Sequence, residues 1–323
     1  MAAVGRTPDE RPLLLALRAL GLGDLLTAVP ALRALAASFP GHRLELAAPA
    51  ALAPLVELVG GGWGMVDTGP LAPVDAGLPA PDVAANLHGR GPESHRVLLA
   101  ARSRRLVAFE HPDVPESHGG PEWRPGEHEV LRWCRMLAES GVPADPEALD
   151  VEPPEDDPPP AARGATLVHP GAASGARRWP AERFAAVARA EAATGRAVAV
   201  TGSAAERGLA SRVVELACLS STVNLAGTTD LRGLAAAVAA ADRVVCGDTG
   251  VAHLATALGT PSVVLFGPTF PEEWGPPPSR PVHRVLWRER RGDPHAAEPD
   301  AGLLEIGVEE VAVALDELPE RRG

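Results

Sequence analysis

Short apolar runs alternate with stretches of helical spacing along this chain, and the series occurs twice. In the first series, strands are predicted at residues 11–17, 42–49, 81–89 and 105–109. Helices are predicted between or after them at residues 25–40, 51–59, 93–103 and 127–141. Such alternation is typical of a parallel sheet with helices on both faces, which makes α/β the predicted fold class.

The alternation restarts after a stretch rich in Pro and acidic residues, VEPPEDDPPPAARG at 151–164. Further strands are predicted at 165–171, 196–203, 222–227, 242–246 and 262–268, with helices at 179–195, 204–217 and 230–241. We interpret 151–164 as an interdomain linker, which gives two Rossmann-like domains at residues 1–155 and 156–323. Ligands of such sheets bind at the carboxyl ends of the strands, so we expect the loops there to face a cleft between the domains.

The charge balance excludes some classes of partner. The 323 residues carry a formal net charge of −12 and include no Lys, so a general nucleic-acid or anionic-membrane surface is not expected. The N-terminal segment is charged, and no apolar run approaches the roughly 18 residues of a membrane span. We therefore expect a cytoplasmic protein whose membrane contact is at most peripheral.

The stretch GDTGVAHLATALGTP at 247–261 lies between two predicted buried strands. The pattern predicts a short helix that ends at Gly259. Asp248 or Thr249 would cap its start. The free N–H groups and positive dipole end of this helix would lie beside Thr249, Gly250 and His253, which favours an anion site.

Two further loops of the second half carry candidate ligand contacts. HPGAASGARRWPAERF at 169–184 places Arg177 and Arg178 together, which suits bidentate binding of phosphate, although a solvated arginine pair is the alternative. VTGSAAERG contains Glu206, which either reaches the ribose hydroxyls of a nucleotide or simply begins a surface helix.

Asp24 lies in the loop after the first predicted strand, ALGLGDLLTAVP. Gly21-x-Gly23 resembles the start of a dinucleotide fingerprint, but Leu26 occupies the position of its third glycine, so that match fails. Asp24 either caps the next helix or is a carboxylate placed to accept a proton from a substrate.

The segment NLHGRGPESH places Asn86, His88 and Arg90 after another strand of the first half, facing the same cleft. The spacing from His88 to His128 matches no zinc pattern, and the three cysteines, which form no C-x-x-C pair, are expected to be buried thiols. No metal site is predicted.

The segments from HPGAASGARRWPAERF through VTGSAAERG to DTGVAHLATALGTPSVVLFGPTFPEEWGP, with the N-terminal LGLGDLLTAVPALRAL, resemble glycosyltransferase family 9, the ADP-heptose:lipopolysaccharide heptosyltransferases and their relatives. The resemblance implies a GT-B fold of two Rossmann-like domains facing a central cleft, with the acceptor on the first and the nucleotide-sugar donor on the second. It also implies an inverting transfer without a bound metal or other cofactor.

The resemblance further implies roles for individual residues. Asp24 would be the general base, and Glu206 would bind the ribose of the donor. Arg177 stands where a Lys is common in the family's diphosphate loop, and Ser174 follows two alanines at places where hydroxyl residues are common. The diphosphate region would be held by Asp248, Thr249, Gly250 and His253.

The predicted function is transfer of a sugar, such as heptose, from a nucleotide diphosphate, expected to be ADP, to a hydroxyl of a glycan, glycolipid or small-molecule acceptor. The acceptor-contacting residues would be Asn86, His88 and Arg90. Two alternatives remain open at this point, a GT-B-like nucleotide-sugar epimerase and a non-catalytic nucleotide-binding protein.

Overall fold

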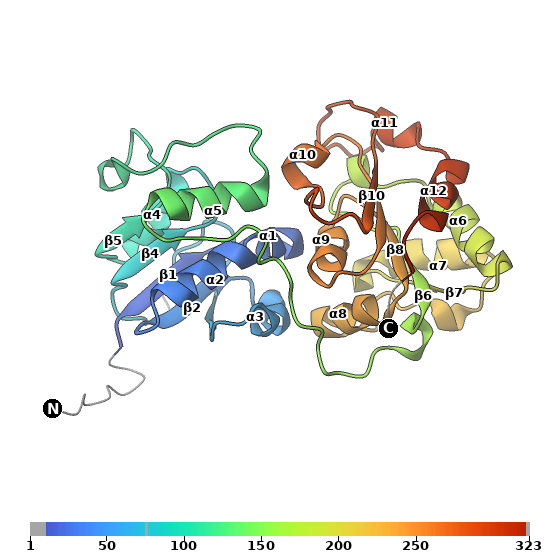
Figure 1. The fold of residues 1–323 in the computed structure, drawn as a ribbon, viewed down its shortest axis with the longest axis horizontal. Helices are drawn as coiled ribbons and strands as arrows, with labels where there is room; N and C mark the ends of the chain where they lie inside the picture. Colours follow the sequence, from blue (N-terminus) through green and yellow to red (C-terminus); the bar gives the residue numbers. More distant parts are fainter. Residues whose placement is uncertain (1–10, 75–76, 321–323) are drawn as a thin grey trace. The chain divides into compact units, whose positions relative to one another are not determined.

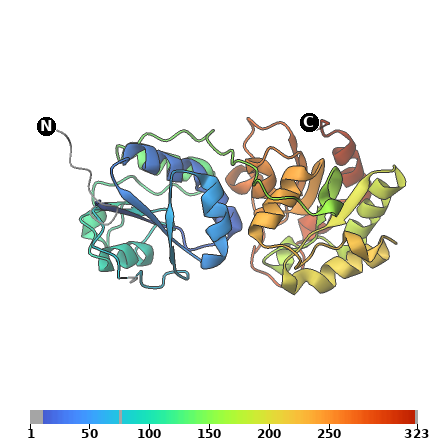
Figure 2. The same cartoon turned by 90° about the horizontal axis from the view of Figure 1, so that it is seen from below.

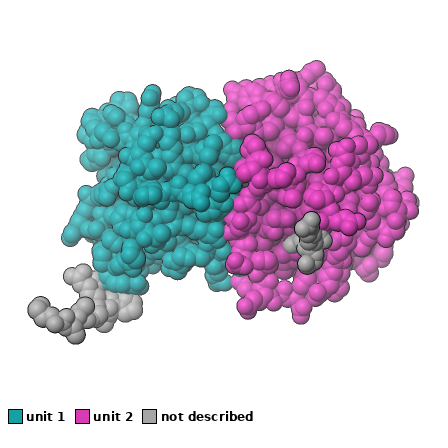
Figure 3. All heavy atoms as spheres, in the orientation of Figure 1, with its two compact units in different colours: residues 1–149 teal, residues 150–323 magenta. Residues whose placement is uncertain are grey.

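The computed structural model describes residues 11–74 and 77–320. It divides into two compact units, residues 1–149 and 150–323 (Figures 1 and 3). This division lies six residues before the predicted boundary, because residues 150–164 belong to the second unit. The Pro-rich segment contacts that unit through a hydrogen bond from Val151 N to Ala257 O and an ion pair of Asp156 with Arg232, and Asp150, just before it, pairs with Arg280. The segment 151–164 therefore packs on the second unit, and the predicted domain boundary stays a prediction.

The first unit contains a five-stranded parallel sheet of order β3-β2-β1-β4-β5. Helices lie on both sides of this sheet (Figure 2). Its strands are β1 (Leu13–Leu17), β2 (Arg43–Ala48), β3 (Gly64–Asp67), β4 (Val83–Asn86) and β5 (Arg105–Val107). Its helices are α1 (Leu22–Thr27), α2 (Val29–Ser38), α3 (Ala53–Val59), α4 (Glu93–Ala100) and α5 (Glu129–Glu139), with 3-10 turns η2 (Ala50–Leu52) and η3 (Pro115–Ser117). The predicted helix at 25–40 begins earlier and is divided into α1 and α2, and β3 was not predicted.

The second unit repeats this architecture with the order β10-β9-β8-β6-β7, again all parallel. Its strands are β6 (Ala165–His169), β7 (Ala197–Val200), β8 (Arg243–Gly247), β9 (Ser262–Leu265) and β10 (His283–Leu286). Its helices are α6 (Ala181–Ala193), α7 (Arg207–Leu216), α8 (Leu231–Ala240), α9 (Gly250–Ala257), α10 (Pro271–Trp274), α11 (Ala301–Leu304) and α12 (Val308–Asp316). Four 3-10 turns are η4 (Pro160–Ala162), η5 (Gly175–Arg177), η6 (Ala204–Glu206) and η7 (Ser221–Val223).

The strand predicted at 222–227 was wrong. Those residues begin within η7, and only Asn224 forms an isolated bridge, to Val200. Ser220 begins the turn by accepting a hydrogen bond from Thr222 N, and this local bond competes with extension of a strand.

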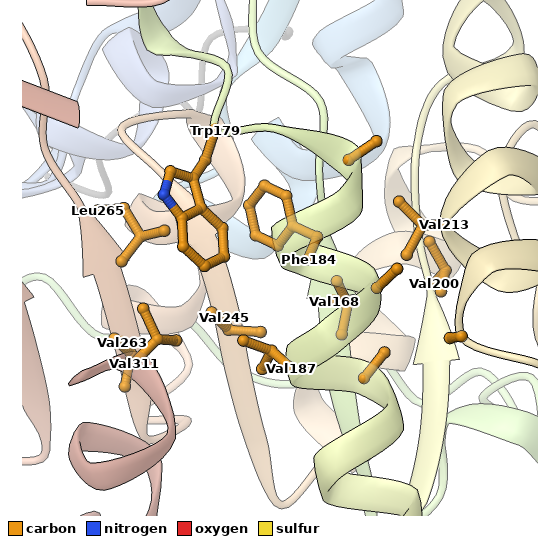
Figure 4. Close-up of a cluster of buried hydrophobic side chains, with 14 of the residues drawn as sticks. Val168, Trp179, Phe184, Val187, Val200, Val213, Val245, Val263, Leu265 and Val311 are labelled. Atoms are coloured by element: carbon orange, nitrogen blue, oxygen red, sulfur yellow. The ribbon is translucent and has the colours of Figure 1, made fainter. Parts of the chain in front are cut away.

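A continuous apolar core fixes the second sheet. Trp179 and Phe184 meet edge to face at 5.0 Å between ring centroids and pack with valines of β6, β7 and β8 (Figure 4). α12 joins this core through Val311, while α9 packs against β8 beside α8 (Figure 1). Because strands and helices of this unit are locked together, the loops at the strand ends have a rigid base.

The structure also bears on the expectations about membrane spans and about the cysteines. Across the described residues, no helix is both long enough and apolar enough to cross a membrane. Cys134 and Cys246 are buried as expected, but Cys218 is exposed, because it follows α7 in a left-handed backbone conformation at the end of that helix.

Candidate functional site

The strand order of the second sheet reverses direction between β6 and β8, and the loops that follow these two strands meet there. Arg177 ends η5, in the loop after β6, and Asp248 directly follows β8. Nη1 of Arg177 lies 3.7 Å from Oδ2 of Asp248 and 3.5 Å from its carbonyl oxygen. Ligands of open α/β sheets bind at such a reversal point, so this pair marks the candidate site of the second unit.

Asp248 is almost fully buried and accepts a hydrogen bond from the Thr269 hydroxyl at 2.5 Å. The expected capping of the following helix by Asp248 was wrong, because its carboxylate is engaged by Thr269 and Arg177. The N-cap of α9 is Thr249, which is extended and makes no side-chain capping bond. The N–H groups of the first turn of α9, which begins at Gly250, therefore have no side-chain cap.

The loop that carries Arg177 is fastened by the segment 293–300. Ser174 donates to Pro294 O at 2.5 Å and accepts from Arg177 Nε at 3.4 Å, while Ala176 N donates to Ala296 O. Arg178 is exposed, and its Nε donates to Ala172 O. The two arginines therefore do not converge, and only Arg177 reaches Asp248.

Glu206 lies close to the end of β6 as well as at a helix start. Its Oε2 accepts from both N and Oγ of Ser203 at 2.8 Å, which is the helix-start role considered from the sequence. Its carboxylate also lies over Gly171, where a Cβ would overlap it. Contact of Glu206 with a ribose stays a prediction.

His169 and His253 flank this region on different elements. His169 ends β6, and its Nδ1 lies 3.0 Å from the Thr201 hydroxyl. Burial lowers the pKa of His169 to about 4, against the opposing charge of Glu206. The ring of His253, on α9, meets Trp274 edge to face at 6.2 Å between centroids. His169 is therefore neutral near pH 7, and His253 lies beside an aromatic side chain.

The first sheet reverses its order between β1 and β4, and Asp24 and His88 lie after these strands. Asp24 is in the first turn of α1, where its Oδ2 accepts from Gly21 N at 3.1 Å. Its Oδ1 lies 3.4 Å from Nη2 of Arg18, and its side chain keeps 27% of its surface exposed. Asp24 therefore does cap the helix, but it also remains open to solvent, so the cap does not decide against a role as base.

The loop after β4 is organised by Asn86. Its buried amide donates to Gly89 O and Ser94 Oγ, and its Oδ1 accepts from His88 N. This network positions His88, whose Nδ1 is buried and has no hydrogen-bond partner within residues 11–74 and 77–320. Arg90 is exposed. Asn86 thus holds the turn, and direct contact of an acceptor with these three residues stays a prediction.

The electrostatics around His88 link it to Asp24. Burial lowers the pKa of His88, the positive charge of Arg18 lowers it further, and the negative charge of Asp24 opposes both. His88 is consequently neutral near pH 7, and a neutral imidazole both donates and accepts hydrogen bonds.

Sequence reasoning missed Arg18, Glu129 and Thr269. Arg18 directly follows β1 and forms the ion pair with Asp24, and Glu129 is bound to Arg18 from α5. A charged residue next to a wholly apolar strand was a signal for Arg18. No local pattern distinguishes Glu129, because its partner lies 111 residues away in sequence.

The structure bears on metal binding only for the residues that it describes. Among residues 11–74 and 77–320, no three His, Cys, Asp or Glu side chains are grouped as they would be around a metal ion.

The chain has relatives among known protein families, individual proteins and solved structures. Residues 122–300, more than half of the chain, match the family model described as glycosyltransferase family 9 (heptosyltransferase). Lipooligosaccharide heptosyltransferase 2 of Haemophilus influenzae is 33% identical over 159 residues, which cover 46% of this chain and 45% of that protein. The chain thus spans about half the length of the curated relatives it matches.

Solved structures match over nearly the full length. The E. coli ADP-heptose lps heptosyltransferase II structure has a TM-score of 0.73 at 21% identity, covering 94% of this chain and 97% of that one. E. coli heptosyltransferase WaaC with ADP has a TM-score of 0.67 at 18% identity, covering 94% and 99%. These likenesses and the two parallel sheets confirm the predicted two-domain α/β GT-B fold.

Proposed function

This chain belongs to glycosyltransferase family 9, and from that premise we propose that it transfers heptose from ADP-heptose to an acceptor hydroxyl of a glycolipid. We also propose that the transfer inverts the configuration at the anomeric carbon and needs no bound metal. The observation that carries the proposal is the pair of charged groups at the two sheet-reversal points: a partly exposed carboxylate, Asp24, at the first and a cation beside a helix start, Arg177, at the second.

The acceptor side of the reaction belongs to the first unit. In the proposed step, the Asp24 carboxylate takes the proton of the acceptor hydroxyl as that oxygen forms a bond to the anomeric carbon. The partial exposure of Asp24 supports this role, since a base must reach a substrate. His88, held by Asn86, would hydrogen-bond the acceptor through its ring.

The donor side belongs to the second unit. As the bond from the anomeric carbon to the phosphate oxygen breaks, the electron pair leaves with ADP, and negative charge grows on the β-phosphate. Arg177 and the N–H groups at the start of α9 would stabilise this charge. Asp248 then orients Arg177, because it is buried, bound by Thr269 and already paired with the guanidinium.

The proposal of a metal-free reaction rests on this positive charge. A guanidinium and uncapped helix N–H groups supply in one place the stabilisation that a divalent cation would supply in another enzyme. The ribose would be bound by Glu206, whose carboxylate lies over Gly171 near the end of β6.

The test is transfer of heptose from ADP-heptose to a lipopolysaccharide core lacking that heptose, with EDTA present and with Mg²⁺ in a parallel arm. We expect release of ADP that depends on the acceptor, at equal rates in both arms, and a product of inverted anomeric configuration by NMR. Activity only with the metal would contradict the metal-free step, and retained configuration would contradict the direct displacement.

Two other outcomes separate the rival activities. A rearranged sugar released without acceptor would identify an epimerase. Binding of ADP-heptose with no turnover on any heptose-deficient core would identify a nucleotide-binding protein, and either result would overturn the proposed transfer.

A further inference from the structure

Arg18 is a fully buried guanidinium placed between two carboxylates of the first unit. Its Nη2 lies 2.9 Å from Oε1 of Glu129, which is 5% exposed, and 3.4 Å from Oδ1 of Asp24, which is 27% exposed. The buried carboxylate therefore has the closer contact, and the exposed one has the longer.

The other contacts of Arg18 fix its position. Its Nε donates to Asp24 O at 2.9 Å, Nη1 donates to Leu87 O, and Nη2 also reaches Thr27 Oγ1 at 3.2 Å. The guanidinium lies 4.9 Å from the ring of Trp133. Arg18 thus joins α1, the loop after β4 and α5 through one rigid planar group.

Glu129 is itself held by two more donors. Trp133 Nε1 donates to Oε1 at 2.9 Å, and Arg132 Nη1 donates to Oε2. Burial alone raises the pKa of Glu129, but the charges of Arg18 and Arg132 with the hydrogen bonds from Arg18 and Trp133 outweigh it, so the pKa lies below its ordinary value. Glu129 is therefore a permanently ionised partner of Arg18 near pH 7.

We propose that Arg18 is a positioning residue for Asp24, and that Glu129 offsets part of the Arg18 charge beside the Asp24 carboxylate. This inference rests on the proposed role of Asp24 as the general base.

The physical reason is a conflict between placement and reactivity. An arginine bound to a carboxylate fixes its geometry, but its full positive charge also favours the ionised form and weakens the carboxylate as a base. Sharing Arg18 with Glu129 keeps the hydrogen bonds to α1 and reduces the net charge that Asp24 experiences. The other titratable group that faces Asp24 is His88, which is neutral near pH 7, and Arg132 contacts Glu129 directly.

The test measures kcat/KM against pH for two substitutions that remove opposite charges. Glu129→Gln keeps an acceptor for Arg18 but leaves its charge without an offset, so activity should persist to lower pH, with the acidic half-point about one pH unit lower. The rate near pH 7 should fall by up to about tenfold, because the base is weaker. Arg18→Gln should move the acidic half-point to higher pH.

Glu127→Gln is the matched control. Glu127 pairs with Arg135 at 2.7 Å just before α5 begins, and it is part of the same region without contacting Arg18. Its pH profile should superpose on that of the native protein. The affinity for ADP and the melting temperature, measured on each sample, show whether a variant is folded.

Opposite shifts for Glu129→Gln and Arg18→Gln support the inference, since a merely structural role would change rates and stability without opposite shifts. If Arg18→Gln fails to fold, Arg132→Gln replaces it, because it leaves the Glu129 charge to Arg18 alone and should likewise raise the acidic half-point. Profiles that all superpose on the Glu127→Gln control would overturn the inference. If Asp24→Asn transfers at the native rate, the proposed base is wrong instead, and the two failures are thereby distinguished.

Discussion

Arg177 is the residue whose charge the proposed donor site depends on most. We expect Arg177→Ala to weaken ADP binding by roughly 10- to 100-fold, the span of one charge-assisted hydrogen bond, and to leave adenosine binding nearly unchanged. The reason is that its proposed partner is phosphate and not the nucleoside. Isothermal titration calorimetry with both ligands measures the difference.

Arg178→Ala is the control for this substitution, because Arg178 is the adjacent arginine and its Nε donates to Ala172 O. It should change ADP affinity little. Equal losses of ADP and adenosine affinity in Arg177→Ala would mean that Arg177 supports the fold through Asp248 and does not bind phosphate.

A separate prediction concerns His283 and the dependence of folding stability on pH. Its Nδ1 bonds to Ser262 Oγ at 2.8 Å, and its Nε2 is buried and has no hydrogen-bond partner among the residues that the structure describes. Burial, followed by the charge of Arg280, lowers the pKa of His283 to about 4. Between about pH 6.5 and about pH 4 the unfolded chain takes up a proton that the folded chain does not. This residue should therefore lower stability as pH falls, by about 1.4 kcal/mol per pH unit, and have no effect above that range.

Melting temperatures at about pH 7 and about pH 5 test this. The decrease on acidification should be smaller in His283→Asn, which keeps a polar group near Ser262 but cannot titrate. An equal decrease in both proteins would show that His283 does not cause the acid sensitivity.

At the scale of elements, η5 depends on close contact with the segment 293–300. A Cβ at Gly175 would collide with the carbonyl oxygen of Ala297, so Gly175→Ala should displace that segment, lower the melting temperature and weaken ADP binding through Arg177. Gly208→Ala in α7 is the matched control, because no atom lies within 4 Å of its added Cβ. It should raise the melting temperature or leave it unchanged. Equal effects of the two changes would argue against the contact.

The elements that the sequence predicted are those with strong patterns. β1 and β8 are apolar runs next to glycine-bearing turns, and α6 has helical spacing over several turns, so local pattern was enough. β10 and α12 were missed because their pairing with β9 and α6 depends on contacts far along the chain. The strand predicted at 222–227 failed because a local hydroxyl bond at Ser220 formed a turn instead.

Residues of the candidate site were predictable where they follow a strand with a strong pattern. Asp24, Arg177 and Asp248 lie after strands whose ends the pattern located, so their loops were found. Thr269, which bonds to Asp248, and Glu129, which bonds to Arg18, lie on other elements, and only the fold brings them to the site. The sequence located the candidate groups, while their electrostatic environment required the structure.

At the scale of the whole molecule, two units of the same topology carry different chemical groups at the same topological position. The reversal point of the first sheet carries a carboxylate, and that of the second carries a guanidinium beside a helix start. A glycosyl transfer needs both a base for the acceptor and positive charge for the leaving phosphate. We therefore predict that a change in the first unit abolishes transfer without affecting nucleotide binding by the second.

Asp24→Asn tests this most directly, with Asp230→Asn as its control. Asp230 caps α8 by accepting from Gly233 N at 2.8 Å, so the same substitution there alters a helix cap outside the site. The assay is heptose transfer from ADP-heptose, with ADP affinity and melting temperature measured on the same samples. We predict that Asp24→Asn lowers kcat by on the order of 100- to 10,000-fold while ADP affinity is unchanged, and that Asp230→Asn transfers at the native rate. Transfer by Asp24→Asn at close to the native rate would contradict the account, because Asp24 would then be a helix cap and not the base.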